Sequence, residues 1–115
     1  MVEDDESTLR ALQRLLEAAG LLSAGFESAE QLLASDAYKD AVCVVSDLIL
    51  PGMSGLDLLA ALRSRDVKSP FILITANDSL SVRAEATARG GIYLAKPVLG
   101  DELLDAIEEA TAIPP

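Results

Sequence analysis

Val42-Cys43-Val44-Val45-Ser46-Asp47 is an apolar, largely β-branched run that ends on an aspartate, and Leu48-Ile49-Leu50-Pro51-Gly52 follows it directly. β-branched side chains favour the extended backbone, so the run is typical of a buried strand. Proline and glycine then favour a loop. The stretch therefore predicts a strand that delivers the Asp47 carboxylate into a loop, and Asp47 becomes the first candidate for chemistry.

The elements around this strand alternate between helical periodicity and short apolar runs. The sequence predicts strands at 21–26, 42–46, 71–75 and 92–94, and helices at 7–19, 28–33, 54–62, 80–89 and 101–110. Ser7, Ser28 and Ser54 are the predicted N-caps of the first three helices. Alternation of this kind is typical of repeated βα units on a parallel sheet with helices on both faces. The predicted fold class is α/β.

Composition limits the functions of the chain. With 115 residues, half of them apolar, residues 1–115 are expected to form a single domain. A net charge of −10 argues against direct nucleic-acid binding, which depends on Lys and Arg at phosphates. No apolar run has the length of a membrane span, so we expect a cytoplasmic protein without membrane contact. The chain has no histidine, and its one cysteine, Cys43, is expected to be a buried thiol without chemistry.

Further polar residues follow predicted strands or stand near the start of the chain. The cluster Glu3-Asp4-Asp5-Glu6 opens the sequence, Thr75 ends the strand at 71–75, and Lys96-Pro97 follows the last strand. Parallel sheets place their ligand crevice at the carboxyl ends of the strands, so these groups are expected to converge on Asp47. Taken singly, a loop aspartate is more often a turn former and a lysine before proline a solvated charge. Together, acids and a lysine indicate a metal and phosphoryl site.

Four ordered motifs resemble the receiver domains of two-component response regulators over essentially the whole chain. They are Val2-Glu3-Asp4-Asp5, Asp47 to Gly55, Ile74-Thr75-Ala76 and Tyr93-Leu94-Ala95-Lys96-Pro97. The resemblance implies a doubly wound parallel sheet of five strands, flavodoxin-like, in the order 2-1-3-4-5. Only Met1 and Val2 precede the acids, so the first strand is expected to be truncated, with native residues suspected upstream.

The resemblance also implies a role for each motif. Asp47 would be the phosphoacceptor, assisted by Thr75 and Lys96, and Thr75 with Tyr93 would form the switch. Mg²⁺, which prefers oxygen ligands, would be held by Glu3, Asp4, Asp47 and the backbone carbonyl of Ile49. The donor would be a phosphohistidine on a histidine kinase or a histidine phosphotransfer protein. The chain would catalyse only its own phosphorylation and slow dephosphorylation.

The output and the lifetime of the signal are less defined. The motifs look most like receivers joined to helix-turn-helix effectors, and a homodimer through the last helix and strand face is one expectation. Apolar Ile49 is expected to shield the acyl phosphate from water, while Asn77 could orient water towards it.

Two other functions stay open. One is an aspartyl phosphatase, although such enzymes need a second acid where this chain has Ile49. The other is a receiver-like interaction module that works without phosphorylation.

Overall fold

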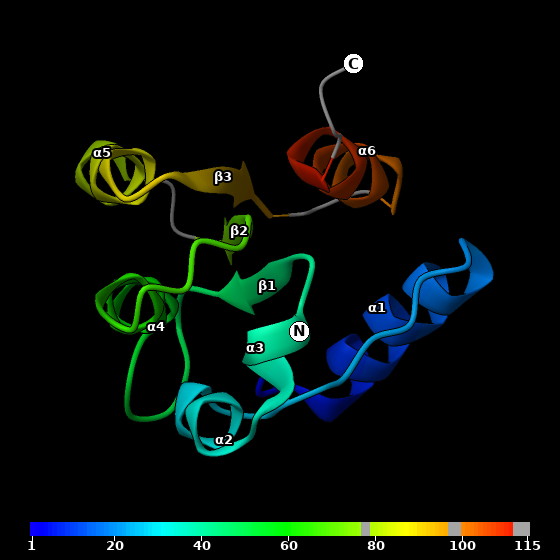
Figure 1. Cartoon of the computed structure of the whole chain (residues 1–115). Coiled ribbons are helices and arrows are strands. Elements are labelled where there is room, and N and C mark those ends of the chain that lie inside the picture. The colour runs from blue at the N-terminus through cyan, green and yellow to red at the C-terminus, as the bar shows by residue number, and fades with distance from the viewer. Residues whose placement is uncertain (77–78, 97–99, 112–115) are drawn as a thin grey trace.

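In the computed structural model, the described residues form a parallel sheet of three strands at the centre of the molecule (Figure 1). The strands are β1 (Val44–Asp47), β2 (Phe71–Thr75) and β3 (Gly91–Ala95), in the order β1-β2-β3. Asp47 is in register with Ile74, and Thr75 is in register with Ala95. The structure describes residues 1–76, 79–96 and 100–111. Because β1, β2 and β3 run parallel in this register, their carboxyl ends lie along one edge of the sheet.

Two isolated parallel bridges extend the sheet beyond β1. Val2 bridges Phe26 on one side and Ser46 on the other. The Val2 amide donates to the Val45 carbonyl at 2.8 Å, and the Asp47 amide donates to the Val2 carbonyl at 3.0 Å. Phe26, Val2, β1, β2 and β3 thus follow one another in the predicted order 2-1-3-4-5. The prediction of a truncated first strand is confirmed.

The predicted strand at 21–26 is wrong. In the segment 21–26 only Phe26 takes part in a bridge, and the described sheet has three strands plus the two bridges. A strand needs the amide and carbonyl groups of a neighbour. Val2 is the one residue that forms a bridge between Phe26 and β1. Among residues 21–25, the carbonyl of Ala24 accepts a hydrogen bond from the Met1 nitrogen at 2.9 Å, but no residue of 21–25 takes part in a bridge.

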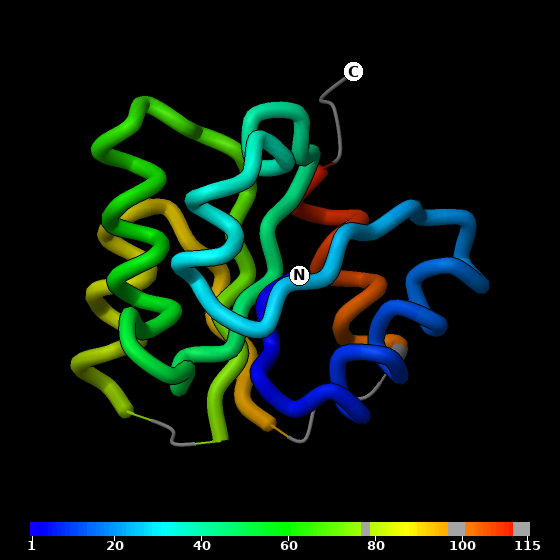
Figure 2. The backbone as a smooth tube through the Cα atoms, turned by 90° about the horizontal axis from the view of Figure 1, so that it is seen from below, coloured from blue at the N-terminus to red at the C-terminus, as the bar shows by residue number. Residues whose placement is uncertain are grey.

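Helices cover both faces of the sheet, as Figures 1 and 2 show. α1 (Glu6–Ala18) and α6 (Gly100–Thr111) lie on one face. The other face carries α2 (Ala29–Ala34), α3 (Ala37–Asp40), α4 (Gly55–Ser64) and α5 (Leu80–Ala88). No helix in the described part of the chain is both long and apolar enough for a membrane span. The doubly wound α/β architecture is confirmed.

The core consists of two apolar clusters, one on each face. Val44, Phe71 and Leu73 face the cluster with α2 to α5, while Val45, Ile72 and Ile74 face the cluster with α1 and α6. Side chains alternate between the faces of a strand, so a strand covered on both sides must be apolar throughout. This explains the apolar run Phe71–Ile74 in β2 and the two valines that open β1.

Capping residues set where the helices begin. Asp5, not the predicted Ser7, is the N-cap of α1, because its carboxylate accepts hydrogen bonds from the Ser7 amide and the Thr8 hydroxyl. Ser28 and Ser54 cap α2 and α4 as predicted. In α4 the Ser54 hydroxyl and the Asp57 carboxylate form a reciprocal capping box. The short helix α3 was not predicted.

Candidate functional site

The ends of three strands place the predicted site residues along one edge of the sheet. Asp47 is the last residue of β1, Thr75 is the last residue of β2, and Lys96 follows β3 directly. The Lys96 amide donates to the Thr75 carbonyl at 2.7 Å, and the Leu48 amide donates to the Ile74 carbonyl at 2.8 Å. These backbone bonds fix where the Asp47 and Lys96 side chains start.

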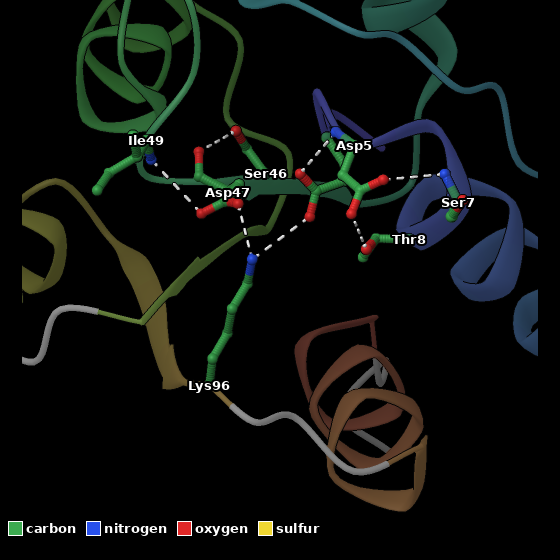
Figure 3. A network of polar contacts seen from close by, with 8 residues as sticks. Asp5, Ser7, Thr8, Ser46, Asp47, Ile49 and Lys96 are labelled. Carbon is green, nitrogen blue, oxygen red and sulfur yellow. Dashed lines mark hydrogen bonds and ion pairs between the residues drawn. The ribbon is translucent and has the colours of Figure 1, made fainter.

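The Lys96 ammonium lies between two carboxylates from distant parts of the chain (Figure 3). Its Nζ atom donates to Oδ2 of Asp47 at 2.8 Å and to Oε1 of Glu3 at 3.4 Å. The other Asp47 oxygen, Oδ1, accepts from the Ile49 amide at 3.4 Å, and Oε2 of Glu3 accepts from the Asp5 amide at 3.3 Å. The structure therefore brings together Glu3, Asp47 and Lys96, as the sequence predicts.

Burial distinguishes the members of this cluster. The side chains of Glu3 and Asp47 are 5% and 11% exposed, while that of Lys96 is 33% exposed. Burial raises the pKa of the Glu3 carboxyl, and the negative charge of Asp47 acts in the same direction. Burial alone would lower the pKa of Lys96, but the hydrogen bonds to Asp47 and Glu3 and the negative charges of these two residues together outweigh burial and leave that pKa raised. Lys96 therefore stays charged at neutral pH and compensates the two acids.

The loop after Asp47 returns very close to β1. The Gly55 amide donates to the Leu48 carbonyl at 2.8 Å, and the Ser46 hydroxyl donates to the Asp47 carbonyl at 2.9 Å. A Cβ atom on residue 55 would overlap the carbonyl oxygen of Asp47. Glycine at position 55 is thus required for α4 to begin directly behind the candidate phosphoacceptor.

An oxygen-only donor set lies at the same edge. Glu3, Asp4 and Asp47 each offer a carboxylate oxygen, and these oxygens lie within 4.8 Å of one another. Three hard anionic ligands fit Mg²⁺ and leave room for the waters that this ion retains. Asp5 lies outside this group and caps α1 instead. The Ile49 carbonyl as a further ligand stays a prediction.

Thr75 and Tyr93 point to the same face of the sheet. Tyr93 pairs with Leu73, and Thr75 stands two residues further along β2, so the side chains of Leu73, Thr75 and Tyr93 share one face. Thr75 is completely buried, while Tyr93 is partly buried against the cluster of α2 to α5. The predicted switch pair is therefore diagonal across two neighbouring strands.

Two contacts of Tyr93 were not predicted from the sequence. Its phenolic oxygen accepts a hydrogen bond from the Ser79 amide at 3.1 Å, and the Arg83 guanidinium lies over its ring at 4.9 Å from the centroid. The sequence indicated these contacts only in part: Arg83 lies in the predicted helix at 80–89, and Ser79 directly precedes that helix. Asn77 and Pro97, also singled out in the sequence, lie outside the described residues.

Known proteins match this chain over nearly its full length. The model of the response regulator receiver domain matches residues 1–108. Nodulation protein W of Bradyrhizobium diazoefficiens is 38% identical over 112 residues, which cover 96% of this chain and 49% of that protein. The DNA-binding transcriptional regulator NtrC of Salmonella typhimurium is 37% identical over 111 residues, which cover 96% of this chain and 24% of that protein. The chain thus spans half or less of the length of these relatives.

A solved structure agrees with the sequence matches. The signal receiver domain of an HD domain-containing protein from Pseudomonas fluorescens superposes with a TM-score of 0.84 at 32% identity, covering 95% of this chain and 89% of that chain. Similarity in fold and similarity in sequence therefore point to the same family.

Proposed function

Because the chain belongs to the response regulator receiver domain family of two-component systems, we propose that Asp47 accepts a phosphoryl group from a phosphohistidine of a partner protein. The phosphorus–nitrogen bond of the donor would break as an Asp47 oxygen bonds to phosphorus, giving an acyl phosphate. Residues 1–115 contain no histidine, so the donor lies outside them, and we assign it to a histidine kinase or a histidine phosphotransfer protein.

The contact between Lys96 and Asp47 is the observation that carries this proposal. Phosphoryl transfer needs an in-line nucleophile and positive charge around the transferring group, with little other chemistry. The Lys96 ammonium, 2.8 Å from the acceptor carboxylate, is placed to provide such charge. Mg²⁺ held by Glu3, Asp4, Asp47 and the Ile49 carbonyl would supply further positive charge at the phosphoryl oxygens.

The signal would pass from Asp47 to the face that carries Thr75 and Tyr93. A phosphoryl group adds acceptor oxygens, for which the Thr75 hydroxyl is a suitable donor. A move of Thr75 towards Asp47 would open space for the Tyr93 ring on the same face, and the surface of α5 and β3 would change. A downstream effector domain or protein would read this surface. With a net charge of −10, this domain would not bind nucleic acid itself.

Intact-mass measurement after incubation with Mg²⁺ and acetyl phosphate tests the proposal. We expect the parent to gain one phosphoryl group and Asp47→Asn to gain none. Asp66→Asn is the matched control, because Asp66 is exposed and has a φ of 62°, a backbone conformation that asparagine tolerates. Adding EDTA should prevent the adduct in the parent.

The other outcomes identify the alternatives. Hydrolysis of acetyl phosphate without an adduct would support an aspartyl phosphatase. Neither adduct nor hydrolysis would support an interaction module that works without phosphorylation. An adduct on Asp47→Asn equal to that on the parent would show that another residue is the acceptor.

A further inference from the structure

Arg83 and Tyr93 form a close contact between α5 and β3. The guanidinium carbon of Arg83 lies 4.9 Å from the centroid of the Tyr93 ring, within the range of about 6 Å in which a cation is attracted to an aromatic face. The molecule contains a second pair of this kind, Arg65 over Tyr38, at the longer distance of 5.7 Å. Arg83 is exposed, so this contact lies at the protein surface.

The same helix also holds the other end of the tyrosine. The phenolic oxygen accepts a hydrogen bond from the amide of Ser79, the N-cap of α5. Ser79 and Arg83 are four residues apart, so both lie above the ring on one side of the helix. If the ring moves away from this position, it loses both the hydrogen bond from the Ser79 amide to its hydroxyl and the contact of its face with the Arg83 guanidinium.

Few side chains of α5 itself pack its first half against the rest of the protein. Of its nine residues, all of which the structure describes, only Ala86 is buried, and Leu80 is 84% exposed. Val82 is partly buried against the core. The Tyr93 ring is therefore a main attachment of the first two turns of α5.

We propose that Arg83 is a positioning residue that holds the Tyr93 ring in the orientation described above and so sets how readily the switch operates. The proposal rests on the proposed function, because it presumes that Tyr93 moves when Asp47 is modified. A contact present only in the resting state reduces the affinity for any ligand that favours the other state, by the free energy of that contact. Loss of the Arg83 guanidinium should therefore ease activation.

Binding of beryllium fluoride, a phosphoryl mimic, in the presence of Mg²⁺ provides the test. For Arg83→Ala we expect half-saturation, followed by ¹⁹F NMR of the bound fluoride, at a concentration about two- to fivefold lower than for the parent, as expected for a cation–π contact at an exposed site. Arg83→Lys, which retains a cation, should lie close to the parent. Arg89→Ala, at the other end of α5, changes the net charge equally and should not differ from the parent.

Two further arms show whether the effect acts through the ring. In a Tyr93→Leu background, Arg83→Ala should leave half-saturation unchanged. In a Tyr38→Phe background Tyr93 is the only tyrosine, and the chain has no tryptophan, so its emission reports directly on the ring. Arg83→Ala should shift this emission towards that of the saturated protein before any ligand is added.

The measurements distinguish a failure of the proposed function from a failure of the inference about Arg83. A parent that forms no adduct with acetyl phosphate and binds no beryllium fluoride overturns the proposed function and this inference with it. A parent that binds normally, with Arg83→Ala binding equally or more weakly, overturns the inference alone. Persistence of the Arg83→Ala effect in the Tyr93→Leu background does the same.

Discussion

The ammonium nitrogen of Lys96 lies 2.8 Å from Oδ2 of Asp47, although 49 positions separate the two residues in the sequence. The same nitrogen lies 3.4 Å from Oε1 of Glu3. Glu3 and Asp47 also belong to the oxygen cluster that fits a divalent cation. The lysine therefore neutralises the acids of the resting protein and, by the same charge, opposes a metal ion that binds to them.

Lys96→Met should separate these two effects. Without the ammonium, phosphorylation by acetyl phosphate should slow by on the order of a hundredfold, because a donor to the transferring group is lost. Affinity for Mg²⁺, measured by calorimetric titration, should increase roughly three- to tenfold, because a like charge is removed from a partly exposed site. Lys39→Met, which removes an exposed lysine, should change neither quantity. Unchanged or weaker Mg²⁺ binding in Lys96→Met would contradict this account.

Gly55→Ala should destabilise the protein through the backbone of Asp47. Alanine is normally the better helix former by about 1 kcal/mol, but here its Cβ would overlap the Asp47 carbonyl and lie 2.8 Å from Cδ1 of Leu73. We expect the free energy of unfolding in urea to fall by about 2 kcal/mol or more, with slower phosphorylation of Asp47. Ser64→Ala, at the other end of α4, should stay within about 0.5 kcal/mol of the parent. Equal stability of Gly55→Ala and the parent would show that the loop can move aside.

An element could be predicted well when its own residues determine it, and poorly when it depends on contacts with distant parts of the chain. The strand at 71–75 was predicted with the observed bounds, because burial on both faces requires the continuous apolar run at 71–74. The segment 21–26 also has the residues of a strand, but pairing depends on neighbouring backbone, which only Val2 provides in ladder geometry. For α1, both Asp5 and Ser7 are residue types that can cap a helix. Asp5 is the N-cap, because its carboxylate accepts hydrogen bonds from the Ser7 amide and the Thr8 hydroxyl.

The candidate site was predictable where strand ends determine it. Asp47 and Lys96 each follow an apolar run, and parallel pairing brings such positions to one edge of the sheet. The contact of Arg83 with Tyr93 could not be read in the same way. It depends on how α5 is set against β3, and helical periodicity does not encode the relative position of two elements.

The stability of the fold should fall at alkaline pH because of Cys43. Burial raises the pKa of its thiol from 9.0 to about 11. The folded state thus holds this proton more tightly than the unfolded chain, so the contribution of Cys43 is present below about pH 9 and is lost as the pH rises through about 11. Urea titrations at several pH values should show a shallower decline between pH 9 and 11 for Cys43→Ala than for the parent. Parallel declines in the two proteins would exclude the thiol as a cause.

Ile49 should control how long the acyl phosphate lasts. Its amide donates to Oδ1 of Asp47, which sets the residue beside the acceptor, and the residue is 57% exposed. Hydrolysis requires a water molecule in line with phosphorus, and an apolar side chain at this place gives that water no hydrogen bond. Ile49→Asn should therefore shorten the half-life of the adduct by on the order of tenfold, less than the gain from a true general base. Intact-mass measurement over time after removal of acetyl phosphate gives this half-life directly, and Ile49→Leu should retain the value of the parent. An unchanged or longer half-life in Ile49→Asn would mean that water reaches the phosphorus by a path that residue 49 does not control.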